Sequence, residues 1–201
     1  MNIKALLSIP YIYNFFQNII GAQKFRKFFA ENFVIAKPES KILDIGCGTS
    51  EILDFLPSEC IYEGYDLSKK YISAATKKYG NRGNWHCSSI SKIKLKNKGS
   101  FDIAIASGIL HHINDEEVIS LAKIVKNALN SSGRFVCVEN AFTESQSTIS
   151  KFIISMDRGK YIRSPEGYKT LLLNHFKHVN FTIHHNLIRV PYTHVVFEAY
   201  N

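Results

Sequence analysis

The sequence predicts a doubly wound α/β domain built on a mostly parallel seven-stranded sheet, and two observations lead to this fold class. Short apolar runs alternate with helical patterns over residues 41–139, the order that a parallel sheet flanked by helices requires. The last two apolar runs, 179–187 and 193–200, flank Pro191 with no helix between them, so they are expected to close one end of the sheet antiparallel. All 201 residues are expected to form one domain, since a single core can serve this length.

The other predicted strands are short apolar runs bounded by turn residues, as expected of strands buried on both faces. They lie at 41–45, 61–66, 85–88, 101–106 and 134–139. The turn before the last of them is predicted at 131–133, where two serines precede a glycine.

Helical patterns fill the connections between these strands. A short helix at 51–56 is stopped by a proline, and a second runs from its cap at Ser68 to Gly80. A third begins at Asn114, which is spaced to form a capping box with Glu117. Its apolar residues recur at helical spacing: Val118, Leu121, Ala122, Val125 and Leu129. A further helix is predicted over 165–176.

Two segments stand apart from the alternating pattern. Residues 1–36 are unusually aromatic, and we expect them to form a helical lid divided into two helices at Gly21. Docking on the sheet is favoured for Phe25, Phe28, Phe29 and Phe33, whereas lid and docking stay equally open for Tyr11, Tyr13 and Phe16. Residues 140–164 lose periodicity, which predicts an insertion over the acceptor side of the site.

Composition excludes several classes of protein. The formal charge of +8 raises affinity for anions in general, but the basic residues are scattered and most simply form a solvated surface. The four cysteines show no C-x-x-C spacing, so we expect buried thiols in a cytoplasmic protein and no metal site. No apolar run reaches the length of a membrane span or of a signal-peptide core, so neither is expected.

A glycine-rich turn, D-I-G-C-G-T, follows the first predicted strand and begins at Asp44. Gly46 permits a sharp turn, and Gly48 lets a ligand approach the backbone. A dinucleotide site would have a third glycine where this chain has Glu51, and Asp44 would repel a diphosphate. Asp66 ends the second strand at the spacing of an acid that binds ribose hydroxyls. The turn therefore favours a nucleoside that carries an ammonium and a sulfonium group.

Four segments in order carry a more specific signal. They are I-L-D-I-G-C-G-T (42–49), Y-E-G-Y-D-L-S (62–68), F-D-I-A-I-A-S-G-I-L-H-H-I (101–113) and L-N-S-S-G-R-F-V-C-V-E (129–139). With them the chain resembles the class I, Rossmann-like S-adenosylmethionine-dependent methyltransferases of small-molecule type over most of its length. The resemblance implies an enzyme that uses S-adenosyl-L-methionine.

The resemblance also implies which residues hold that cofactor. Gly46 and Gly48 would cradle its methionine part, Asp44 would hold its amino group through water or backbone, and Asp66 would bind the ribose. The other cofactor residues expected from the ends of the second, third and fourth strands are Leu67, Ser88, Ser89, Ile90 and Ser107. Many relatives carry an acid after the third strand, where this chain has a serine, and the usual L-K-P-G-G turn is changed to L-N-S-S-G.

Methyl transfer from a sulfonium is an in-line displacement, so alignment of the acceptor is the main requirement. An oxygen acceptor of high pKa also needs a general base, for which His111 after the fourth strand is a candidate, with ordering of its loop as the alternative role. The remaining candidates on the acceptor side come from late segments: Asp157, Arg158, Arg163, Tyr192 and His194, of which Tyr192 and His194 are expected to be catalytic. The arginines suit an acidic group on the acceptor, unless Asp157 and Arg163 pair with each other.

The function expected from these residues is methylation of a small molecule, on oxygen in preference to nitrogen, by a monomer or homodimer. A nucleic-acid base methyltransferase is the first alternative, but Ser107 begins S-G-I-L instead of the N/D-P-P-Y of amino-methylating enzymes, and no Pro-Cys nucleophile is present. A non-catalytic, cofactor-binding partner subunit is the second alternative, and a nicotinamide dehydrogenase the third. The carboxylates of Asp44 and Glu51 disfavour the dehydrogenase.

Overall fold

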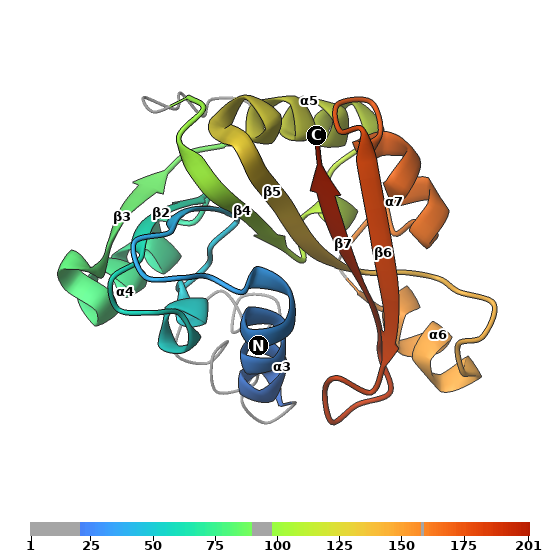
Figure 1. Ribbon diagram of the computed structural model, residues 1–201. Coiled ribbons are helices and arrows are strands. Elements are labelled where there is room, and N and C mark those ends of the chain that lie inside the picture. The colour runs from blue at the N-terminus through green and yellow to red at the C-terminus, as the bar shows by residue number, and fades with distance from the viewer. Residues whose placement is uncertain (1–20, 90–97, 158) are drawn as a thin grey trace.

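The structure is a computed structural model that describes residues 21–89, 98–157 and 159–201. Within these ranges the strands form one seven-stranded sheet in the order β3-β2-β1-β4-β5-β7-β6 (Figure 1). The strands are β1 (Lys41–Ile45), β2 (Ile61–Asp66), β3 (Gly83–Cys87), β4 (Phe101–Ser107), β5 (Leu129–Asn140), β6 (His178–His185) and β7 (Thr193–Tyr200). β1 to β5 pair in parallel, and β7 is antiparallel to both of its neighbours. The predicted fold class is confirmed.

Five α-helices lie in the described part of the chain, and α4 and α5 begin at the predicted caps. They are α3 (Ala22–Phe29), α4 (Lys69–Tyr79), α5 (Asp115–Ala128), α6 (Thr148–Ser155) and α7 (Pro165–Leu172). Ser68 caps α4 by accepting from Tyr71 N–H, and Asn114 and Glu117 form the capping box of α5. α6 lies within 140–164, where the sequence shows no clear periodicity. In the described part of the chain, no helix combines the length and hydropathy needed to span a bilayer.

Several local predictions need correction. Of the thiols expected to be buried, Cys87 is exposed and Cys47 is only partly buried. The helix predicted at 51–56 is a 3₁₀ helix, Glu51–Phe55, and the one predicted at 165–176 ends as a helix at Leu172. The turn predicted at 131–133 lies inside β5, where the pairing with β4 shifts register between Phe101 and Ile103. A bulge can absorb these residues because the extra backbone bends out of the ladder without ending the strand.

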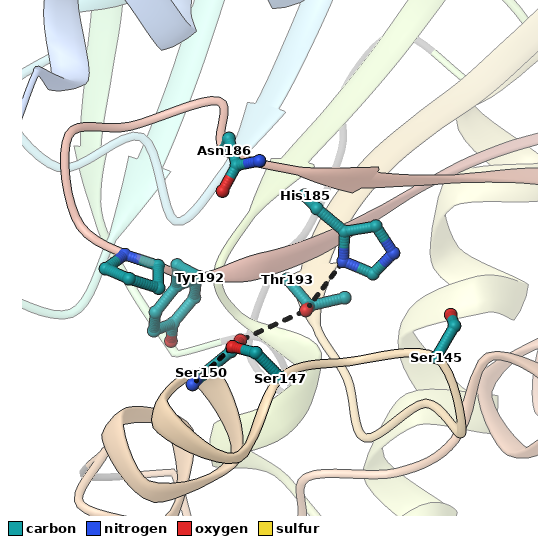
Figure 2. Close-up of a pocket in the computed structure, with 8 residues that line it drawn as sticks. Ser145, Ser147, Ser150, His185, Asn186, Tyr192 and Thr193 are labelled. Carbon is teal, nitrogen blue, oxygen red and sulfur yellow. Dashed lines mark hydrogen bonds between the residues drawn. The ribbon is translucent and has the colours of Figure 1, made fainter.

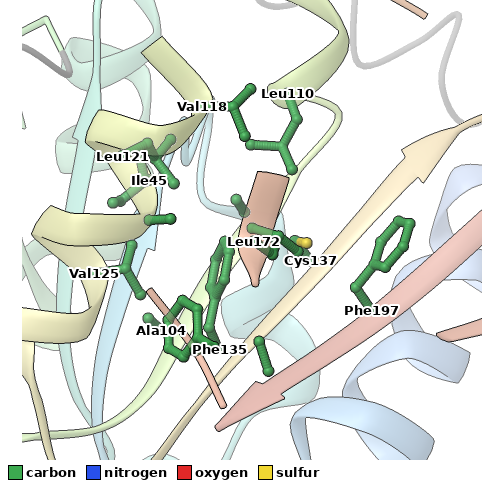
Figure 3. Packing of buried hydrophobic residues seen from close by; sticks show 14 of the residues in the cluster. Ile45, Ala104, Leu110, Val118, Leu121, Val125, Phe135, Cys137, Leu172 and Phe197 are labelled. Carbon is green, nitrogen blue, oxygen red and sulfur yellow. The ribbon is translucent and has the colours of Figure 1, made fainter. Parts of the chain in front are cut away.

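Helices cover both faces of the sheet, and a buried cluster lies under each cover. On one face α5 and α7 pack against the sheet through residues such as Val118 and Leu172 (Figures 1 and 3). On the other face Phe29 and Phe33, of α3 and the turn of helix that follows it, pack against the sheet, with Phe25 and Phe28 partly buried beside them. The docking predicted for these four phenylalanines is confirmed. Residues 1–20, including Tyr11, Tyr13 and Phe16, lie outside the described residues.

The sheet order places several loops at one edge. The chain passes from β1 outward to β3, then returns to β4 on the other side of β1. Ile45 at the end of β1 therefore pairs with both Tyr65 and Ala106, near the ends of β2 and β4. In open α/β sheets ligands bind at such a reversal, beyond the carboxyl ends of the strands. The loops after β1, β2, β4 and β5 are thus the place for a site.

Candidate functional site

The glycine turn after β1 has one packed position and one open position. Gly46 and Gly48 both have positive φ, +75° and +55°. A Cβ atom on Gly46 would overlap the Cδ1 and Cγ1 atoms of Ile109, whereas one on Gly48 would meet no atom within 4 Å. Gly46 therefore lets the loop after β4 pack onto the turn, and Gly48 leaves backbone open to a ligand.

This difference predicts unequal losses of stability. Gly46→Ala is expected to lower the free energy of unfolding by about 2 to 4 kcal/mol, since a strained φ and overpacking against Ile109 both contribute. Gly48→Ala has similar backbone strain and open space, so it should cost only about 1 to 2 kcal/mol. Urea unfolding of both variants measures the difference. Equal losses would show that Ile109 moves aside without cost.

Two carboxylates flank this turn. Asp44 is buried at the sheet, 4% exposed, and accepts a 2.6 Å hydrogen bond from the Tyr62 hydroxyl. Burial raises its pKa to about 7 in spite of the Tyr62 bond, and the nearby Asp66 charge adds to the rise. Asp66 accepts from Gly48 N–H at 3.0 Å and from Ser68 N–H at 2.7 Å. The carboxylate of Asp66 therefore joins the ends of β1 and β2 beside the open glycine.

The other predicted cofactor residues lie at the carboxyl ends of β2, β3 and β4. Leu67 is 71% exposed next to Asp66, and Ser107 is exposed at the end of β4. Ser88 follows β3, donates its N–H to Asp66 O at 3.0 Å and donates its hydroxyl to Ser89 O at 3.2 Å. Ile90 lies outside the described residues. The described members therefore share one edge of the sheet with the glycine turn, as predicted.

Glu139, which is not among the predicted site residues, organises the loop after β4. Its side chain is 1% exposed and accepts hydrogen bonds from the backbone N–H groups of Ile109, Leu110 and His111 at 2.9, 2.8 and 3.3 Å. It also lies 2.5 Å from Nδ1 of His111. A sequence signal exists: the acid directly follows the apolar run F-V-C-V, and a buried carboxylate needs several donors.

His111 is held by carboxylates on both ring nitrogens. Nδ1 contacts Glu139, and Nε2 lies 3.4 Å from Oδ1 of Asp157. Burial alone would lower the pKa of His111, but the hydrogen bonds and charges of Asp157 and Glu139 outweigh it and raise the pKa to about 9. An imidazolium has no lone pair to accept a proton, so this arrangement argues against the predicted base. The alternative role, ordering of the loop, fits the contacts.

Asp157 and Tyr192 meet on the acceptor side of this histidine. The Tyr192 hydroxyl donates to Oδ2 of Asp157 at 3.1 Å and accepts from the Asn140 amide at 2.7 Å. Burial and the Asp157 charge raise the pKa of Tyr192 well above its usual value, so the phenol stays protonated at neutral pH. Tyr192 therefore orients the Asp157 carboxylate.

Arg163 does not pair with Asp157, which was one of the two alternatives that the sequence left open. Arg163 binds Asp115 at 2.6 and 2.9 Å and donates to the carbonyls of Leu110, Ile113 and Tyr161. These bonds occupy its guanidinium, so Arg163 pins the loop before α5 and does not suit recognition of an acidic acceptor. Arg158 lies outside the described residues.

His194 lies beside α3, and its ring also contacts the Tyr192 ring at a centroid distance of 4.9 Å. Its ring stacks on Phe25 at a centroid distance of 5.0 Å, and its buried Nδ1 has no hydrogen-bond partner among the described residues. Burial, and next the neighbouring His184, lowers the pKa of His194 to about 4. Such a weak base, packed against a phenylalanine, does not fit the predicted catalytic role.

A polar pocket adjoins Tyr192. It encloses about 180 Å³ between α6, the loop before that helix and the ends of β6 and β7 (Figure 2). Its lining consists of Ser145, Ser147, Ser150, His185, Asn186, Pro191, Tyr192 and Thr193. Hydroxyl groups dominate this lining. Tyr192, which lines the pocket, donates to Asp157, and Asp157 contacts His111. These two contacts connect the pocket to His111.

Comparisons with known proteins bear on this arrangement. A family described as "Methyltransferase domain" matches residues 42–133, and no curated protein sequence matches the chain. The fold is similar to that of an S-adenosylmethionine-dependent methyltransferase from Archaeoglobus fulgidus, with a TM-score of 0.74 and 18% identity over 95% of this chain and 100% of the other.

Two further similar structures were crystallised with cofactor or product. Human N-acetylserotonin methyltransferase, in complex with S-adenosylmethionine, has a TM-score of 0.68 and 15% identity over 89% of this chain, which spans 51% of that enzyme. Geranyl diphosphate C-methyltransferase from Streptomyces coelicolor, in complex with Mg²⁺, geranyl diphosphate and S-adenosyl-L-homocysteine, has a TM-score of 0.65 and 14% identity. Its alignment covers 89% of this chain and 77% of that one.

Proposed function

We propose that this chain, which has a matched methyltransferase domain over residues 42–133 and the fold of such enzymes, is a class I, Rossmann-like S-adenosylmethionine-dependent methyltransferase, and that its acceptor is a small polar molecule methylated on oxygen or nitrogen. The observation that carries the proposal is the glycine turn. Gly48 has open space where a side chain would stand and donates its N–H to Asp66, and Asp44 precedes the same turn, so two carboxylates are available to a cationic nucleoside.

The residues of this turn fit the cofactor as follows. Gly46 and Gly48 would lie against its methionine part, Asp44 would balance the cationic amino acid end, and Asp66 would accept from the ribose hydroxyls through its remaining lone pairs. Leu67, Ser88 and Ser107 would border the nucleoside. When bound, S-adenosylmethionine supplies an electrophilic methyl group.

The acceptor side is formed by the segment 140–164 and the last two strands. The pocket of about 180 Å³ supports a small acceptor, and its hydroxyl-rich lining supports a polar one. Asp157, which comes from this segment, contacts His111 at the end of β4, so the pocket and the cofactor edge are joined by one hydrogen-bonded network. That network would orient the acceptor and keep water from it.

Loss of the Asp66 carboxylate tests the cofactor site. Asp66→Ala is expected to weaken S-adenosylmethionine binding by about 1 to 3 kcal/mol, because charge-assisted hydrogen bonds to the ribose are lost. Isothermal titration calorimetry measures the dissociation constant. Asp54→Ala, which removes an exposed carboxylate bound to Lys78, is the matched control and should bind as the wild type does. An unchanged constant for Asp66→Ala would remove this residue from the site.

A further inference from the structure

Two histidines after β4 and the carboxylate of Asp157 form a cluster with metal-ligating chemistry. One ring nitrogen from each of His111 and His112 and one carboxylate oxygen of Asp157 all lie within 4.8 Å of one another. His111 is buried, Asp157 is half-buried and His112 is exposed. One ligand of the cluster is therefore enclosed by the protein, and another faces solvent.

Neighbouring side chains hold His111 and Asp157 in fixed orientations, as residues next to the ligands do in metalloproteins. His111 directs Nδ1 to the buried Glu139 carboxylate at 2.5 Å, which turns Nε2 toward Asp157. The Tyr192 hydroxyl holds Oδ2 of Asp157, which directs Oδ1 toward His111. In metalloproteins a ligating imidazole donates its second N–H to a carboxylate, and ligating carboxylates are themselves hydrogen-bonded. Both features are present here.

The backbone also brings the two segments together closely. A Cβ atom on Gly159 would overlap the His111 ring, so only glycine lets the chain after Asp157 approach the imidazole. Gly159 N–H donates to Oδ1 of Asp157 at 2.8 Å, and Tyr161 N–H donates to the His111 carbonyl at 3.0 Å. These contacts fix Asp157 next to a histidine that is 46 positions away in the sequence (157 − 111).

We propose that His111, His112 and Asp157 bind a divalent transition-metal ion, and that zinc is the ion favoured by this donor set. Two imidazoles and a carboxylate suit zinc, and three protein ligands leave a fourth position for water or substrate. Charge points the same way. The His111 ring lies between the carboxylates of Glu139 and Asp157, and a cation bound at Nε2 would be attracted by both.

The use of this ion in catalysis rests on the proposed function, although its binding does not. The open position would take an oxygen of the acceptor and favour loss of its proton to solvent. The new C–O bond then forms while the S–C bond breaks, and sulfur keeps that electron pair. The metal would thereby replace the general base and favour oxygen acceptors over nitrogen.

Calorimetric titration of the full chain with zinc chloride, after removal of metal by a chelator, tests the site. One Zn²⁺ is expected to bind per chain, and Co²⁺ should give the visible absorption bands of a four-coordinate ion. His112→Gln and Asp157→Asn should each weaken Zn²⁺ binding by about tenfold or more. His178→Gln is the control, since His178 is exposed on β6 and stacks on Tyr200, and it should bind as the wild type does.

The proposal fails if the wild type binds no Zn²⁺, or if both ligand variants bind it as tightly as the control does. Circular dichroism checks the folding of each variant, and His112 is exposed, so its replacement leaves the core intact. Titration of the stripped protein with S-adenosylmethionine separates the two proposals. Cofactor binding without zinc binding overturns the metal site alone, whereas zinc binding without cofactor binding overturns the proposed function alone.

Discussion

Glu139→Ala is expected to lower the free energy of unfolding by about 3 to 5 kcal/mol, as removal of one partner from a buried charged network does. The carboxylate of Glu139 accepts from the backbone of Ile109, Leu110 and His111 and lies against the His111 ring. Alanine would leave these buried donors without an acceptor. Urea unfolding followed by circular dichroism gives the loss directly.

Two matched variants make this result specific. Glu198→Ala breaks an ion pair with Arg134 on the partly exposed surface of β7, and it should cost about 1 kcal/mol or less. Glu139→Gln keeps an oxygen that accepts from the same backbone groups, so it should recover part of the loss. If Glu139→Ala is no worse than Glu198→Ala, the loop after β4 finds other acceptors and Glu139 does not organise it.

The fold could be predicted because its determinants are local. The capping box at Asn114 and the cap at Ser68 each lie within one turn of the helix that they begin. Errors arose where tertiary contacts override the local signal. The turn at 131–133 became a bulge, because β5 continues its pairing with β4 on both sides of it.

The glycine turn could be located from the sequence, since Asp44, Gly46 and Gly48 stand within five positions of one another, and their role toward the cofactor stays a prediction. His111, Asp157 and Tyr192 could be named as candidates on the acceptor side, but their contacts with one another and with Glu139 could not be predicted in this way. The four residues come from the ends of separate elements. The sheet order brings β4, β5 and β7 together, and the side-chain contacts show that Asp157 binds His111 and not Arg163.

Cofactor affinity is expected to rise with pH up to about 7.5, because Asp44 changes charge in this range. Burial raises the pKa of Asp44 to about 7 in the free protein, and a cationic ligand binds the carboxylate form more tightly. Each pH unit below 7 should therefore weaken binding by up to about tenfold. Calorimetry between about pH 5.5 and 7.5 suits the test, since the ligand's α-amino group titrates near 8.

Asp44→Asn should remove this pH dependence, because the amide has no proton to lose, and Asp54→Asn should keep it. Asp44→Asn is also expected to stabilise the free protein at pH 8. The folded pKa of about 7 exceeds the ordinary aspartate value of 3.8, so Asp44 contributes stability at low pH that is lost as the pH rises through 7. This shift corresponds to roughly 4 kcal/mol against the charged form.

The two effects of Asp44→Asn have opposite signs, and this makes the substitution decisive. If Asp44→Asn unfolds at a higher urea concentration but binds S-adenosylmethionine weakly at pH 7.5, the Asp44 charge contributes to ligand binding and lowers the stability of the free protein. A variant that loses stability shows instead that the hydrogen bond from Tyr62 needs the carboxylate. In that case Asp44 belongs to the framework of β1, and the preference of the turn for a cationic ligand needs another source.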